Sequence, residues 1–146
     1  MSEFVFICES IPVLREDMAH GIIKLGHRAH VSGNKLSEIK KIIRGINGIS
    51  QSQQSANMGS FKPSVVIFSL SEKSPLGIVD QKRIKSLKSL TAGAPIMAIW
   101  PLSYVDPNKT RSFLEEGLIT TVFRKQITNY LTVEEVVENV KKFLRK

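Results

Sequence analysis

The sequence has only one cysteine, Cys8, so no disulfide can form within the chain. It has no apolar run near the ~20 residues that a membrane-spanning helix needs. Its first residues show neither the basic segment nor the cleavage site of a signal peptide. The histidines, His20, His27 and His30, do not have the spacing of a metal-binding set. These absences favour a cytoplasmic protein without disulfides, membrane segments or a bound metal.

Acidic residues are too few to balance the basic ones: 13 Asp and Glu stand against 21 Lys and Arg, which gives a net charge of +8. The densest basic groups lie between Lys82 and Lys88 and between Lys141 and Lys146, both on expected amphipathic helices. Charge of this kind is typical of a solvated helix face. It also favours an acidic partner, so a nucleic-acid-associated protein is kept as the alternative function.

The chain does contain a repeated alternation of short apolar runs and helical patterns. Apolar runs without internal alternation indicate strands that are buried on both faces. Five strands are expected, over residues 4–8, 27–31, 64–70, 95–100 and 119–123. Each is followed by apolar residues at helical spacing. The pattern predicts a single α/β domain over residues 1–146, with a doubly wound parallel sheet and helices on both faces.

Polar residues predict where several helices begin and where one connection is long. Ser10 is expected to cap the first helix and Asp106 the fourth. Thr132 and Glu135 have the spacing of a capping box for the last helix. The stretch 47–60 is polar and without period, which predicts a mobile loop or insertion.

Parallel sheets bind ligands just beyond the carboxyl ends of their strands. In this chain the rule selects the segments Cys8-Glu9, Ser69-Leu70-Ser71, Trp100 and Arg124-Lys125. Cys8 is either a redox-sensitive thiol or a small apolar side chain at the end of a buried strand. Trp100 is either a binding anchor or the filling of a closed pocket.

The order of these segments resembles the receiver domains of bacterial response regulators, over nearly the whole chain apart from 47–60. The run from Pro63 to Leu70, followed by Pro75 and Gly77, is similar to the third strand of that family and the loop after it. The resemblance implies a flavodoxin-like sheet with strand order 2-1-3-4-5. It also implies that Ser69 occupies the position of the phosphoacceptor aspartate.

The residues that carry the chemistry of that family are largely replaced. Cys8-Glu9 stands where the family has an acidic pair that holds magnesium, and Trp100 stands where it has Thr or Ser. Arg124-Lys125 replaces Lys-Pro, and Thr121 replaces an aromatic switch residue. A single carboxylate is a poor ligand set for Mg²⁺, and an unassisted hydroxyl is a weak nucleophile. We therefore expect no phosphoryl transfer to Ser69 and no cofactor.

The resemblance with these replacements implies a pseudo-receiver: a phosphorylation-independent regulatory or protein-interaction module, not an enzyme, in bacterial-type signal transduction. Its partner is expected to be a signalling protein or a second copy of the chain. A small enzyme is a third alternative, but the strand ends offer no nucleophile–base pair, glycine-rich phosphate loop or metal cluster. Arg124 is expected to pair with Glu9 in place of the metal ion, because a guanidinium can bind a carboxylate through two parallel hydrogen bonds.

Overall fold

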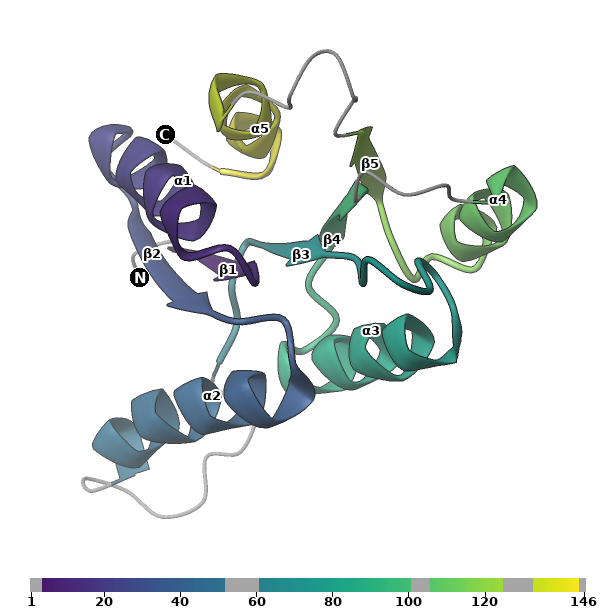
Figure 1. The fold of residues 1–146 in the computed structure, drawn as a ribbon. Coiled ribbons are helices and arrows are strands. Elements are labelled where there is room, and N and C mark those ends of the chain that lie inside the picture. Colours follow the sequence, from purple (N-terminus) through teal and green to yellow (C-terminus); the bar gives the residue numbers. More distant parts are fainter. Residues whose placement is uncertain (1–3, 52–60, 101–105, 125–132, 145–146) are drawn as a thin grey trace.

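Short strands and helices alternate along the chain (Figure 1). The computed structural model describes residues 4–51, 61–100, 106–124 and 133–144, without the side chains of 47–51, 100 and 121–124. The strands are β1 Phe4–Cys8, β2 Arg28–Ser32, β3 Val65–Ser69, β4 Ile96–Trp100 and β5 Thr121–Arg124. The helices are α1 Pro12–Lys24, α2 Leu36–Gln51, α3 Ile78–Leu90, α4 Pro107–Glu115 and α5 Val133–Val140, with a 3-10 turn, η1, over Lys141–Phe143. Within the described ranges, every helix is too short or too polar to span a lipid bilayer.

The strands are all parallel and form one sheet in the order β2-β1-β3-β4-β5. In its register, Cys8 lies opposite Ser32 on one side and Phe68 on the other. At the far side of the sheet, Trp100 lies opposite Arg124. The carboxyl ends of the strands therefore meet at one edge. The expected α/β class, a parallel sheet with helices on its faces, is confirmed.

Two layers of apolar side chains lie on the two faces of the sheet. Successive residues of a strand point to opposite faces, so Ile7 belongs to one layer and Phe6 to the other. Helices α1 and α5 cover the first face, above the sheet in Figure 1. Helices α2, α3 and α4 cover the second face. Their buried contributions to these layers are Met18, Ile22, Val136 and Val140 on the first face, and Ile39, Ile43, Ile84, Leu87 and Phe113 on the second.

The expected cap of α1 is wrong, whereas that of α4 is confirmed. Helix α1 has Ile11 at its N-cap position and no side-chain cap there. The Oε2 atom of Glu9 instead accepts a hydrogen bond from the N–H of Ile11 at 3.0 Å. This bond fixes the N-cap residue itself and leaves the first turn of α1 without the side-chain cap that Ser10 was expected to supply. At α4, Asp106 is the N-cap and its side chain accepts from the N–H of Asn108 at 2.9 Å.

The first part of the loop expected over 47–60 is helical in the structure. Helix α2 continues to Gln51, so residues 47–51 are helical, and 52–60 lie outside the described residues. Ile43 and Ile46 pack against the core, and Ile49 continues their spacing in the sequence. This apolar period outweighs the cost of Gly48 within a helix, which is about 1 kcal/mol relative to Ala. Thr132, the expected cap of α5, also lies outside the described residues.

Candidate functional site

The structure brings two of the predicted site residues together at the carboxyl edge of the sheet. The register that sets Cys8 opposite Phe68 places Glu9 next to Ser69, at the ends of the neighbouring strands β1 and β3. Both are buried: Glu9 is 0% exposed and Ser69 is 3% exposed. A carboxylate and a hydroxyl therefore lie below the surface at the point where a receiver domain would expose its acidic groups.

Glu9 is held in place by the backbone around it. Its N–H donates to the carbonyl of Ser32 at 3.0 Å, which extends the pairing of β1 with β2 by one residue. Its Oε2 accepts from the N–H of Ile11 at 3.0 Å and from the hydroxyl of Ser10 at 3.5 Å. Its backbone carbonyl accepts from Nη1 of Arg15 at 3.1 Å. Its Oε1 is buried and has no hydrogen-bond partner among the described residues, so the carboxylate is only half satisfied.

Cys8 does not face this edge. Its side chain is 0% exposed and belongs to the apolar layer under α2 and α3, together with Phe6 and Phe68. Burial raises the pKa of the Cys8 thiol well above its usual range. A buried neutral thiol is a poor nucleophile and is inaccessible to oxidants. The packing therefore favours the small apolar side chain over the redox-sensitive thiol.

Asn34 is a residue of this edge that sequence reasoning missed. It follows β2, it is 8% exposed, and its Nδ2 donates to the carbonyl of Ser69 at 2.9 Å. This bond ties the loop after β2 to the end of β3, across the intervening strand β1. The rule that selects strand ends could have found Asn34, because β2 ends at the same edge as the other strands.

Asp80 is a second residue that was missed, and it organises the loop between β3 and α3. It is 0% exposed. Its carboxylate accepts from the N–H of Leu76 at 2.8 Å, from the N–H of Ser71 at 3.1 and 3.2 Å, and from the Ser71 hydroxyl at 3.2 Å. Burial raises the pKa of Asp80 above its ordinary value, although these hydrogen bonds and the charge of Arg83 oppose the rise. The signal in the sequence is an acidic residue at the third position of a helix, where carboxylates reach back to the backbone before it.

The remaining predicted site residues are placed only in part. Trp100 ends β4, and Thr121 and Arg124 begin and end β5, but their side chains lie outside the description. Lys125 lies wholly outside it. The roles assigned to these residues therefore stay predictions. Over the described residues, no group of three or more His, Cys, Asp or Glu side chains could hold a metal ion.

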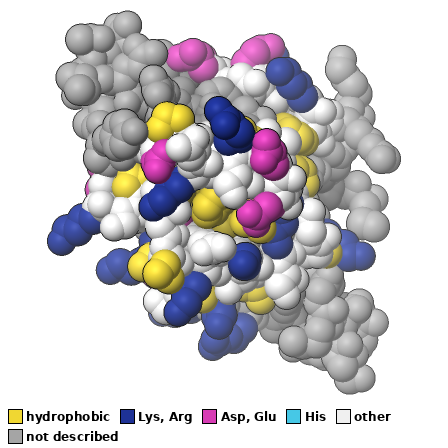
Figure 2. Space-filling model, turned by 90° about the vertical axis from the view of Figure 1, so that its right-hand side faces the viewer, with side chains coloured by type: hydrophobic (Ala, Val, Ile, Leu, Met, Phe, Trp, Pro, Cys, Tyr) yellow, Lys and Arg dark blue, Asp and Glu magenta, His cyan; other side chains and the backbone are white. Residues whose placement is uncertain are grey.

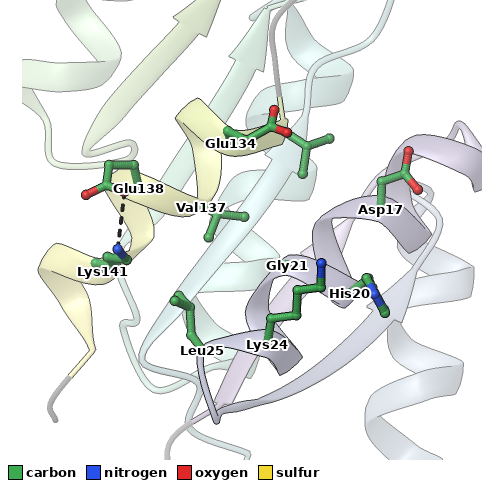
Figure 3. Close-up of a pocket in the computed structure, with 10 residues that line it drawn as sticks. Asp17, His20, Gly21, Lys24, Leu25, Glu134, Val137, Glu138 and Lys141 are labelled. Atoms are coloured by element: carbon green, nitrogen blue, oxygen red, sulfur yellow. Dashed lines mark ion pairs between the residues drawn. The ribbon is translucent and has the colours of Figure 1, made fainter.

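A groove away from the strand ends runs between α1 and α5 (Figure 3). Both walls carry charged side chains of each sign. Asp17 and Lys24 lie on α1, whereas Glu138 lies on α5 and Lys141 on η1. Lys141 and Glu138 form an ion pair of 3.2 Å. The two helices approach closely at Gly21, where an added Cβ would lie 2.7 Å from Cγ2 of Val137. The groove is thus a seam between two packed helices, lined by side chains of both charges.

Comparison with known proteins gives the fold. An orphan response regulator of H. pylori superposes with a TM-score of 0.62 at 15% identity, covering 99% of this chain and 98% of that one. A response regulator from Thermotoga maritima gives 0.62 at 12% identity, covering 98% of each chain. A CheY-like receiver domain protein from Methanospirillum hungatei gives 0.61 at 10% identity, covering 97% and 93%. No protein-family model and no curated protein sequence matches the chain. These similarities confirm the receiver fold.

Proposed function

We propose that this protein is a pseudo-receiver: a regulatory or protein-interaction module of bacterial-type signalling that works without phosphorylation. The observation that carries the proposal is the edge at Glu9 and Ser69. A serine stands where the receiver fold places its acceptor, and it is 3% exposed. The neighbouring carboxylate of Glu9 is fully buried and already bonded to the backbone of Ile11.

The chemistry of phosphoryl transfer supports the same view. Such transfer depends mainly on positioned charge, and in particular on metal ions that neutralise the phosphoryl oxygens. Mg²⁺ requires nearly octahedral oxygen ligation. Of the two buried carboxylates near this edge, Asp80 already accepts hydrogen bonds from Ser71 and Leu76, and Glu9 has one oxygen left. A single remaining carboxylate oxygen is too little to bind the ion and activate Ser69.

Exposed apolar side chains support a protein partner near the same edge. Ile11 and Val13, around the start of α1, are 45% and 70% exposed. Ile78 and Val79, at the start of α3, are 73% and 49% exposed. These helices follow β1 and β3, so all four side chains lie on the segments that leave the strand ends. Apolar residues of this kind are common at the centre of protein interfaces. The H. pylori protein of the same fold is itself described as an orphan response regulator.

The predicted pair of Glu9 with Arg124 belongs to this proposal. Strands β3 and β4 lie between β1 and β5. Neighbouring strands are about 4.8 Å apart, so the backbones of the two ends are separated by about 14 Å. Pairing therefore requires both side chains to extend along the edge toward one another. In this pair, the guanidinium of Arg124 supplies the positive charge that a magnesium ion supplies in an active receiver.

Intact-mass spectrometry after incubation with acetyl phosphate and magnesium tests the proposal. We expect no gain of a phosphoryl group by the wild-type protein. Ser69→Ala is the matched variant, and Ser74→Ala, in the exposed loop before α3, is the control. A stoichiometric phosphoryl gain that disappears in Ser69→Ala and persists in Ser74→Ala would falsify phosphorylation independence.

A further inference from the structure

The net charge of the chain is concentrated in one stretch of the sequence. Residues 35–90 contain ten lysines and arginines against three carboxylates, a net charge of +7 out of the +8 of the whole chain. The remaining residues contain 11 basic and 10 acidic side chains and are nearly neutral. This stretch includes α2 and α3, which pack on the same face of the sheet. Seven of the ten basic residues lie on these two helices, so most of this charge belongs to one face of the molecule.

The basic residues of that face point away from the core. On α2 and α3, the buried apolar positions are Ile39, Ile43, Ile84 and Leu87. The outward positions form what we call the α2–α3 face: Lys40, Lys41, Arg44, Lys82, Arg83 and Lys85. Figure 2 shows one side of it, where Lys and Arg side chains gather over the lower part of the molecule and the acidic side chains lie above them.

Acidic neighbours do not neutralise the α2–α3 face. Asp80 is turned inward and fully buried, which leaves Glu38 as the one exposed carboxylate on the two helices. Lys40, Lys41, Arg44, Lys82 and Lys85 form no ion pair with any described carboxylate. Lys88 is not counted in the face, because its Nζ donates to the carbonyl of Ala94 at 3.2 Å. A cluster of unpaired cations produces a positive potential that attracts polyanions.

The composition of the face selects among polyanions. Neither α2 nor α3 contains an aromatic residue, so the face has no platform on which single-stranded bases could stack. The described exposed positions of α2 are polar or glycine, and its apolar side packs on the sheet. On α3 the exposed apolar side chains, Ile78 and Val79, are confined to the first turn, so the face lacks the continuous apolar stripe that a membrane-inserting helix presents. Lysine is depleted in the cores of protein interfaces. An array of flexible cations on two rigid helices suits the regularly spaced phosphates of a duplex.

We infer that the α2–α3 face binds the sugar–phosphate backbone of double-stranded nucleic acid, without preference for base sequence. This activity is separate from the proposed regulatory role of the strand ends, and neither requires the other. Contacts to phosphates position a protein on the duplex and carry no sequence information directly. Affinity should therefore fall with salt and should be equal for unrelated sequences.

Fluorescence anisotropy with labelled 20-base-pair DNA and RNA duplexes of random sequence tests this inference. We expect a Kd of about 10⁻⁴–10⁻⁶ M near physiological salt, which is the usual range of non-specific binding. In the variant Lys40→Gln, Lys41→Gln, Lys82→Gln, the affinity should fall about tenfold or more. The slope of log K against log salt should decrease by about 0.9 for each phosphate that the variant no longer neutralises.

A matched control removes the same charge from the opposite face. The variant Lys24→Gln, Lys141→Gln, Lys142→Gln also replaces three exposed lysines, so its net charge is the same. Its affinity should stay within about twofold of the wild type, because its lysines lie on the α1–α5 side. Circular dichroism melts of both variants establish that each is folded.

Three results would overturn the inference. The first is no binding of either duplex at about 50 mM KCl, where phosphate contacts are strongest. The second is an equal loss of affinity in the two lysine variants, since that would reflect net charge and not this face. The third is binding of sodium polyglutamate as tightly as of the duplexes, which would assign the face to an acidic protein. The inference is supported if either duplex binds and if binding is lost in the α2–α3 variant but not in the control variant. The duplex that binds more tightly then identifies the nucleic acid.

Discussion

Two buried carboxylates lie near the carboxyl edge of the sheet, and they are used differently. Asp80, in the first turn of α3, accepts hydrogen bonds at both oxygens, from Ser71 and Leu76. Glu9, directly after β1, has one oxygen bonded to Ile11 and the other without a described partner. The comparison teaches that burial alone does not identify a site residue. A carboxylate whose oxygens are all occupied is part of the scaffold, whereas one with an open oxygen retains the capacity to bind.

Replacing the fully bonded carboxylate should have the largest effect. Asp80→Ala leaves the buried N–H groups of Ser71 and Leu76 without an acceptor, so we expect a loss of about 3 kcal/mol in the free energy of unfolding. Asp106→Ala, which removes the cap of α4, is the control and should cost about 1 kcal/mol. Urea denaturation measures both. If the two variants lose the same stability, Asp80 is not the anchor of its loop.

A double-mutant cycle tests whether the carboxylate of Glu9 pairs with Arg124. If Arg124 pairs with Glu9, then Glu9→Gln combined with Arg124→Ala should cost about 1 kcal/mol less than the sum of the single losses. The reason is that each single variant already removes the same interaction. Asp80→Asn combined with Arg124→Ala is the control cycle and should be additive, because the oxygens of Asp80 are already occupied.

Thermal melts with and without millimolar magnesium test whether Glu9 binds a metal ion. A ligand raises the melting temperature only by binding the folded state. Glu9 is the only buried carboxylate among the described residues with an unbonded oxygen, and the described residues contain no group of three or more acidic, His or Cys side chains that could hold the ion, so the two melts should coincide. A clear rise with magnesium, or a strictly additive Glu9–Arg124 cycle, would show that the open oxygen of Glu9 is not neutralised by Arg124.

The smallest expected effect is a pH dependence that belongs to Asp80. Its folded-state pKa is raised above the ordinary 3.8, because burial disfavours the charged form. When the pKa of a carboxyl group is higher in the folded protein than in the unfolded chain, the folded state binds the proton more tightly. The resulting stabilisation is fully present below the pKa of the unfolded chain and is lost as the pH rises through the pKa of the folded protein. The stability difference between wild type and Asp80→Ala should therefore be larger at about pH 4.5 than at pH 7. A difference that grows toward neutral pH would mean that the hydrogen bonds outweigh burial.

The sequence predicts what depends on local pattern and misses what depends on distant contacts. The apolar runs predict the strands, and Asp106 before Pro107 predicts the start of α4, because period and caps involve residues close along the chain. The bond from Asn34 to the carbonyl of Ser69 joins segments that meet only in the folded sheet. The role of Asp80 depends on a loop in which Leu76 has a φ of +59°, a conformation that its sequence does not indicate.

The place of β1 within the sheet affects how the protein can fold during synthesis. Strand β1 is made before the other four strands of the sheet, yet it lies between β2 and β3. Its pairing with β2 can form early, but its other side needs β3, which begins at Val65. At ~5–20 residues per second, the intervening chain takes about 3–12 s to emerge from the ribosome. For that time one side of an apolar strand has no partner, and such an unpaired strand edge is where nascent chains associate with one another or with chaperones.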